Sequence, residues 1–170
     1  MTLRPDHGLP EVRLRRIRPD DKDRLVAGLG RLSKRSVYQR FLAPKPRLTT
    51  SELRYLTEVD FTDHYALVAV LAGHPEVVVG VGRWVRDVER PDHAEVAVVV
   101  ADDLQGRGVG TTLGTALADA AVQRGITRFT ATMLPGNHAA RRLFARLSRR
   151  LEVVSDGAVH ELVAELAAAA

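Results

Sequence analysis

The 170-residue sequence contains no cysteine, so it can form no disulfide, no thiolate metal site and no cysteine nucleophile. Aromatic residues make up only 5%, with a single tryptophan, which leaves little material for stacking nucleic-acid bases. No apolar run approaches the roughly 20 residues of a membrane-spanning helix, and the first ten residues lack the apolar core of a secretory signal. We therefore expect one globular domain in the cytoplasm, with no membrane partner.

Lysine is scarce as well. Lys22, Lys34 and Lys45 are the only three, although Lys and Arg together number 25 and the formal net charge is +4. The positive charge is thus nearly all arginine, whose planar fork suits phosphate oxygens. A solvated arginine-rich surface and an anionic partner both remain open, the latter being a phosphorylated cofactor or a nucleic acid. Only charge supports a nucleic acid, and we expect none.

The spacing of apolar residues divides the chain into strands and helices. Apolar runs or alternation predict strands at 11–17, 65–72, 77–85, 95–101 and 127–133, and a closing hairpin about Asp156-Gly157. Helical spacing predicts helices after 19–21, at 34–41, from Thr49, at 109–124 and at 138–147. The order favours a mixed α/β (α+β) domain over residues 11–166, with a flexible 1–10 and a frayed 167–170.

The stretch AEVAVVVADDLQGRGVGTTLGTALADA, residues 94–120, joins a predicted strand to a predicted helix through Gly106, Gly108 and Gly110. Glycine adopts positive φ and lets other atoms approach the backbone closely. The first amides of a helix have no intrahelical partner and carry partial positive charge. The stretch therefore predicts an anion pocket, with phosphate as its usual ligand.

Three phosphate-binding motifs were compared with this turn. A P-loop needs Gly-Lys-Ser/Thr, which is absent, and a Rossmann Gly-x-Gly-x-x-Gly would need its third glycine elsewhere. The pattern Gln/Arg-x-x-Gly-x-Gly/Ala is satisfied by Gln105, Gly108 and Gly110. That pattern is the coenzyme A pyrophosphate loop of the GNAT N-acetyltransferase superfamily, which this chain resembles. The segment MLPGNHAARRLFARLS resembles a later part of the same family, and most of the chain resembles bacterial protein lysine acetyltransferases.

The resemblance implies a fold and an activity. It implies the GNAT fold, an about seven-stranded, mostly antiparallel sheet with about four flanking helices and splayed central strands. It implies direct transfer of acetyl from acetyl-CoA, without a metal, to a protein lysine (for example on an acyl-CoA synthetase) or to a small amine. We expect the protein to be a monomer or a homodimer.

Glu95 is the candidate general base. It opens the strand that leads into the glycine turn, and alternation places it on one face with Ala97 and Val99. Such apolar neighbours predict a raised carboxyl pKa, which suits a base. In the enzymes that the chain resembles, a glutamate at the matching position has this role. The alternative is a strand-end glutamate that faces water.

The remaining site residues follow from the resemblance. The backbone of Val98, Val99 and Val100 is expected to pair with the pantetheine arm of the cofactor. The pyrophosphate is expected on the turn Gln105, Gly106, Arg107, Gly108, Val109, Gly110 and Thr111. Asn137, alternatively a helix N-cap, and Arg141 are expected to contact the cofactor. We expect the arginines at 142, 146, 149 and 150 to be solvated.

One position departs from the family pattern. Many GNAT enzymes have a tyrosine that returns a proton to the departing thiolate, and Phe144 stands there in this chain. Phenylalanine cannot donate a proton, so a core position is expected for it. An active acetyltransferase and a CoA-sensing module without turnover therefore both remain open.

Overall fold

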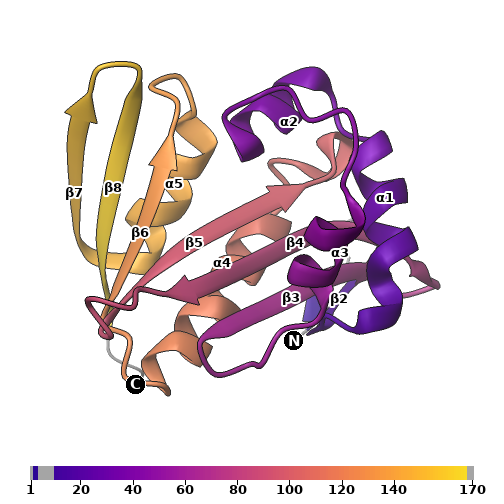
Figure 1. Cartoon of the computed structure of the whole chain (residues 1–170), viewed down its shortest axis with the longest axis horizontal. Helices are drawn as coiled ribbons and strands as arrows, with labels where there is room; N and C mark the ends of the chain where they lie inside the picture. Colours follow the sequence, from indigo (N-terminus) through magenta and orange to yellow (C-terminus); the bar gives the residue numbers. More distant parts are fainter. Residues whose placement is uncertain (1, 4–9, 168–170) are drawn as a thin grey trace.

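The strands form one eight-stranded sheet in the order β1-β2-β3-β4-β5-β6-β8-β7 (Figure 1). The structure is a computed structural model that describes residues 2–3 and 10–167. Every neighbouring pair is antiparallel except β5 and β6, which are parallel. The strands are β1 Thr2–Leu3, β2 Val12–Arg16, β3 His64–Leu71, β4 His74–Arg86, β5 His93–Val100, β6 Arg128–Met133, β7 Ser148–Asp156 and β8 Val159–Leu166. The predicted mixed class is confirmed, with the two-residue β1 as an additional strand.

Within the described residues, five α-helices cover the sheet, as the helical spacing predicts, whereas the resemblance implied about four. They are α1 Lys22–Gly30, α2 Lys34–Phe41, α3 Thr50–Thr57, α4 Val109–Val122 and α5 His138–Leu147. The first three lie on the near face in Figure 1, and α4 passes behind β4 and β5. Two short 3₁₀ turns, Pro19–Asp21 and Asp102–Leu104, precede α1 and follow β5. The early helices and the glycine turn therefore flank the same central strand, β5.

The larger core lies between the sheet and the helices α4 and α5. Trp84, Phe129, Leu113 and Leu117 are fully buried there. Gly82 of β4 allows α4 to approach closely, because a Cβ at this position would lie 2.7 Å from Leu117 Cδ1. A smaller core packs α1 and α3 against the other face. Helix packing on both faces holds the central strands rigidly beneath the site.

The two parallel strands separate soon after they meet. The β5–β6 pairing covers only His93 to Glu95, opposite Arg128 to Thr130. Beyond Glu95, β5 runs on to Val100 beside β4 alone, while β6 continues beside β8. The expected splay of the central strands is confirmed, and Figure 1 shows the two strands diverging.

The structure describes only some of the residues at the expected domain boundaries. Thr2 and Leu3 pair with β2, and residues 1, 4–9 and 168–170 lie outside the described residues. No helix in the described ranges has the length and apolar character needed to cross a membrane.

Candidate active site

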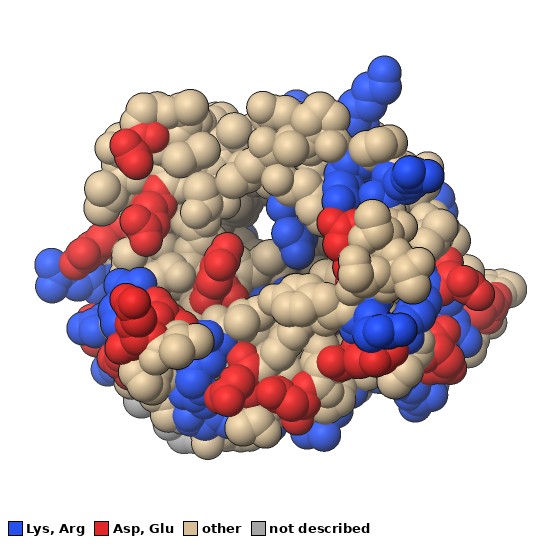
Figure 2. Space-filling model, viewed as in Figure 1, with Lys and Arg blue, Asp and Glu red and all other residues tan. Residues whose placement is uncertain are grey.

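A cleft of about 590 Å³ opens where β5 and β6 separate. Its walls are β5, the turn that follows β5, the first residues of α4, the end of β6, α5 and the inner side of α2. Figure 2, which has the same view as Figure 1, shows a hollow near the middle of the molecule. A cleft of this size is typical of small-molecule sites.

The backbone of β5 presents alternate residues to this cleft. Ala101 N–H donates to Val79 O, so the residues in register with it bond to β4. In an antiparallel ladder the intervening residues direct both backbone groups away from the partner strand. Val98 and Val100 therefore turn their N–H and C=O groups toward the cleft, whereas the N–H of Val96 belongs to the last parallel pair of β5 and β6, Glu95 with Thr130. Val99 also lines the cleft, but its backbone groups lie on the β4 side.

The glycine turn presents a row of unpaired amides. Gly106 and Gly108 have φ values of +73° and +86°, which L side chains rarely adopt, and Gly108 is the N-cap of α4. The first helical bond is donated by Thr112 N–H to Gly108 O. Among the described residues, no acceptor receives the backbone N–H groups of residues 106–111. These donors meet at a helix N-terminus on the rim of the cleft, an arrangement that binds anions.

The side chain of Gln105 is engaged within the protein. Its Nε2 donates to Val100 O at 3.0 Å and to Ser36 Oγ at 3.1 Å. Asp102 accepts from Ser33 N–H at 2.6 Å and from Ser36 Oγ. Burial opposes ionisation of Asp102, but hydrogen bonds from Ser36 and Ser33 hold its pKa below the ordinary value. Gln105 and Asp102 thus join the turn to α2, a link that the sequence analysis missed.

Three of the expected cofactor residues do not line the cleft: Arg107, Val109 and Arg141. Val109 is buried, and Arg107 and Arg141 are exposed. The cleft side of α5 carries Arg142 and Arg146 instead, and Arg146 Nη1 lies 3.5 Å from Thr111 Oγ1. The orientation of α5 therefore directs Arg142 and Arg146, which were expected to be solvated, toward the cleft in place of Arg141.

The other expected residues lie on the cleft. Asn137 lines it and also caps α5, since its Oδ1 accepts from Ala140 N–H at 3.1 Å. Both interpretations of Asn137 are therefore compatible with one geometry. Phe144 is buried in the main core, as expected, and it also forms part of the cleft wall.

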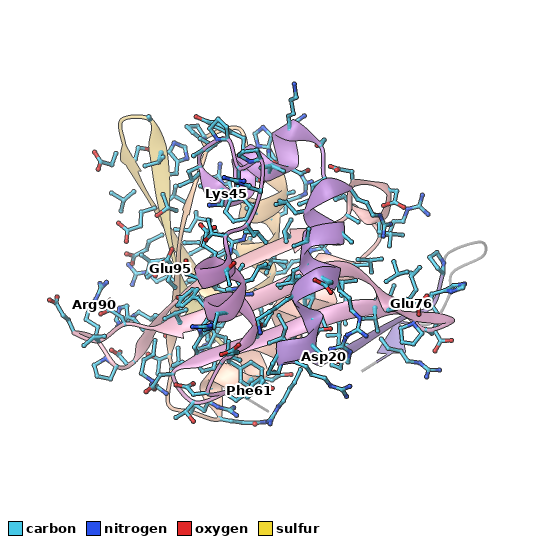
Figure 3. The ribbon with its side chains drawn as sticks, turned by 45° about the vertical axis from the view of Figure 1, so that its right-hand side comes forward. Asp20, Lys45, Phe61, Glu76, Arg90 and Glu95 are labelled. Carbon is cyan, nitrogen blue, oxygen red and sulfur yellow. The ribbon has the colours of Figure 1, made fainter. Side chains whose placement is uncertain are left out.

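Glu95 lies at the end of the cleft remote from the glycine turn. It is exposed, whereas Ala94 and Val96 on either side are buried (Figure 3). The prediction that apolar residues surround its carboxylate is therefore wrong, because no helix of the described residues covers the face of β5 that carries Glu95 at this end of the strand. The carboxylate is instead accessible to a molecule that enters the cleft.

A second group of polar side chains, missed by the sequence analysis, lies on the same side of the sheet as Glu95. Arg83 is 5% exposed, and its Nη1 donates to His64 Nε2 at 3.0 Å. Burial and the charge of Arg83 lower the pKa of His64 to about 4, so the imidazole is neutral near pH 7. The His64 ring lies 4.9 Å from the Tyr55 ring, and Arg40 lines the cleft nearby.

No group of three His, Asp or Glu side chains within residues 2–3 and 10–167 is arranged to hold a metal ion. The class of protein follows from comparison with known families. Residues 34–148 match the model of the acetyltransferase (GNAT) family, and the chain belongs to that family. GNAT acetyltransferases use acetyl-CoA as the acetyl donor.

Particular relatives narrow the comparison. The acetyltransferase Pat of Mycolicibacterium smegmatis is 38% identical over 134 residues, which cover 79% of this chain and 40% of that protein. The chain thus spans well under half of that relative. The GNAT domain of Streptomyces lividans PAT superposes with a TM-score of 0.83 at 34% identity, covering 92% of this chain and 91% of that domain.

A further structure shares the fold alone. A protein from Salmonella typhimurium, solved with its cofactor acetyl-CoA, has a TM-score of 0.70 at 18% identity, covering 91% of this chain and 92% of that one.

Proposed function

We propose that this chain transfers acetyl from acetyl-CoA directly to the side-chain amine of a protein lysine, with Glu95 as the general base. The observation that carries the proposal is the row of unpaired amides at 106–111, which opens onto the same cleft as Glu95. The likeness to two Pat proteins supports a protein acceptor. We expect residues 11–166 to form one acetyltransferase domain, located in the cytoplasm, as a monomer or homodimer.

The described residues fit the cofactor at two places. The amides of Gly106 to Thr111 would receive the diphosphate, with Arg142 and Arg146 adding positive charge from α5. The backbone groups of Val98, beyond the last β5–β6 pair, would bond to the amide-containing arm, as an added strand does in a sheet. The Val100 carbonyl already accepts from Gln105, so it is less available.

Acetyl-CoA supplies an activated thioester, so the protein has to deliver a neutral amine to it. A lysine amine has a pKa near 10.4 and is protonated at pH 7. Glu95 is an exposed carboxylate on the cleft and would accept that proton directly or through water. The cleft-facing N–H groups of β5 would polarise the thioester oxygen. Phe144 offers no proton to the thiolate, which would take one from water.

Two measurements test the proposal in sequence. Calorimetric titration with acetyl-CoA checks the cofactor site, and micromolar or tighter binding is expected. Thiol release with an acyl-CoA synthetase, followed by mass spectrometry of its lysines, checks the reaction. If the chain binds acetyl-CoA but releases no thiol with the acyl-CoA synthetase or with a panel of small amines, it is a CoA sensor instead. A protein that ignores acetyl-CoA would refute the proposal altogether.

A further inference from the structure

The buried guanidinium of Arg83 has no anionic partner among the residues that the structure describes. Its Nη1 donates to the neutral His64, and its Nη2 donates to the Leu56 carbonyl at 3.1 Å. Burial, followed by the positive charge of Arg40, lowers the pKa of Arg83 to about 9, so it remains charged at neutral pH. A buried charge that has only neutral partners is unfavourable, since buried ions in proteins are normally paired.

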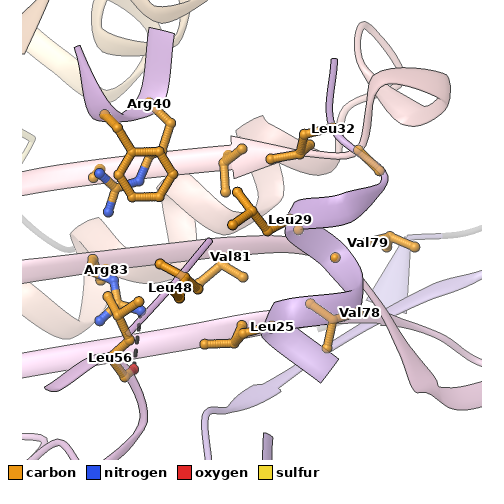
Figure 4. Close-up of a pocket in the computed structure, with 16 residues that line it drawn as sticks. Leu25, Leu29, Leu32, Arg40, Leu48, Leu56, Val78, Val79, Val81 and Arg83 are labelled. Atoms are coloured by element: carbon orange, nitrogen blue, oxygen red, sulfur yellow. Dashed lines mark hydrogen bonds between the residues drawn. The ribbon is translucent and has the colours of Figure 1, made fainter. Parts of the chain in front are cut away.

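A second arginine nearby is partly buried. Arg40 of α2 lies between the cleft and an apolar cavity of about 70 Å³ that is also lined by Arg83 (Figure 4). Its guanidinium carbon lies 5.0 Å from the centre of the Phe41 ring. No carboxylate of the described chain forms an ion pair with either arginine. Burial lowers the pKa of Arg40, and the negative charge of Glu95 opposes this shift.

The sheet register places this arginine pair close to the proposed base. Arg83 is directly opposite Ala97, and Glu95 lies two residues before Ala97 on the same face of β5. Two residues of strand span roughly 7 Å. Tyr55, which is 56% exposed, adds a hydroxyl near both arginines on the open side. Arg40 lines the cleft that holds Glu95, and Arg83 lines the cavity that adjoins this cleft, so a molecule whose amine meets Glu95 would have a second polar group beside Arg40 and close to Arg83.

We propose that Arg40 and Arg83 form a carboxylate-binding subsite for the acceptor, so that the favoured acceptor carries a carboxylate a short distance from its reacting amine. This inference rests on the proposed transfer reaction and adds the acceptor's chemical class. The carboxylate belongs either to an acidic residue beside the target lysine or to a small amino acid. Two guanidinium groups repel additional cationic groups, so polyamines and other polycations are poor acceptors.

The acceptor, rather than the acyl chain, is assigned to this subsite because of the side of the sheet on which it lies. Arg40, Arg83 and Glu95 share the face that carries α1–α3. The amides proposed for the cofactor lie at the far end of β5, and the cofactor arm would follow the gap between β5 and β6. The amine must approach the base from the arginine side.

Calorimetry with unreactive CoA bound tests this assignment without turnover. Two pairs of probes are compared: acetyl-Asp-Lys amide with acetyl-Asn-Lys amide, and alanine with alaninamide. In the wild type, the carboxylate member of one pair should bind at least about tenfold more tightly, as for a charge-assisted hydrogen bond. The pair that shows the preference identifies the source of the carboxylate.

Variants connect the preference to the arginines. R40Q and R83Q should reduce it to within about twofold, whereas R31Q should retain it because Arg31 is an exposed arginine at the end of α1. The CoA affinity of each variant reports whether it folds. If R83Q does not fold, the carboxylate preference of R40Q alone tests the inference.

Three results would overturn the inference. These are equal affinities within both probe pairs, a preference that survives in R40Q, and an arginine-dependent preference for succinyl-CoA over acetyl-CoA with no acceptor preference. The last result would assign the subsite to the acyl chain. Thiol release with acetyl-CoA is measured separately, so a failure of the transfer reaction is distinguished from a failure of carboxylate recognition.

Discussion

Replacing Glu95 with glutamine tests the proposed base most directly. The change keeps the size of the side chain and removes its charge and its basicity. A positioned general base typically contributes 10²- to 10⁴-fold to the rate. We expect kcat for acetyl transfer to fall by about that factor, because glutamine cannot take the proton from the lysine ammonium.

Acetyl-CoA affinity should hardly change in E95Q. Five residues of strand separate Glu95 from Val100, where β5 ends before the glycine turn, and at about 3.3 Å per residue they span roughly 16 Å. Glu95 is exposed, so water separates it from the proposed diphosphate site. Two unit charges at that distance in water interact by about 0.3 kcal/mol, and salt screens this further. The expected change in Kd is below about twofold for each charge of the diphosphate.

Turnover is measured by thiol release under saturating acetyl-CoA, and Kd by calorimetry. E89Q is the matched control, because Glu89 is an exposed glutamate in the connection before β5, and it should leave both values unchanged. A kcat for E95Q within about threefold of the wild type would show that Glu95 is not the base. A collapse of both kcat and acetyl-CoA affinity would show that Glu95 maintains the cleft instead.

Four further variants probe the cofactor turn and the contacts of α1 and α4. G108A forces a side chain onto a φ of +86°, at a cost of about 1–2 kcal/mol, and should weaken acetyl-CoA binding about tenfold in calorimetry. Burial opposes ionisation of Asp21, but arginine hydrogen bonds hold its pKa at about 2; D21N should cost about 2 kcal/mol in urea unfolding at pH 7. This difference should shrink as pH falls from 5 towards 2, since the wild-type carboxylate then protonates and loses its contribution. G114A should lower the melting temperature, because its Cβ would lie 2.9 Å from Leu147 Cδ1, whereas G28A in α1 meets nothing closer than 3.8 Å and should raise it.

The features that could be predicted from the sequence are those set by local spacing. The β-branched runs predicted β3, β4 and β5, and the Asp156-Gly157 pair predicted the β7–β8 hairpin. The positive φ values at Gly106 and Gly108 follow from glycine's freedom at a strand-to-helix turn. In each case the signal lies within a few residues of the feature that it predicts.

Features that depend on long-range placement were missed or wrong. Arg83 reaches the site because the β3–β4–β5 register places it between Ala66 and Ala97, and no local pattern contains that register. Arg141 was expected on the cleft. Successive residues of a helix point in directions about 100° apart, so Arg141 and Arg142 cannot both face the cleft. Because α5 carries arginines on more than one side, the sequence does not show which of them faces the cleft. Alternation gave the correct face for Glu95, yet it cannot say where the covering helices stop.

The contacts that join α2 to the glycine turn make the two halves of the proposed site interdependent. Asp102, just after β5, accepts from Ser33 N–H and Ser36 Oγ at the start of α2, and Gln105 of the turn donates to Ser36 Oγ. The same helix carries Arg40 about one helical turn after Ser36, so the conformation of the glycine turn constrains where that guanidinium lies. If a bound diphosphate orders the turn, the acceptor meets a better placed arginine. Binding free energies are reciprocal, so the acceptor must then strengthen acetyl-CoA binding by the same factor.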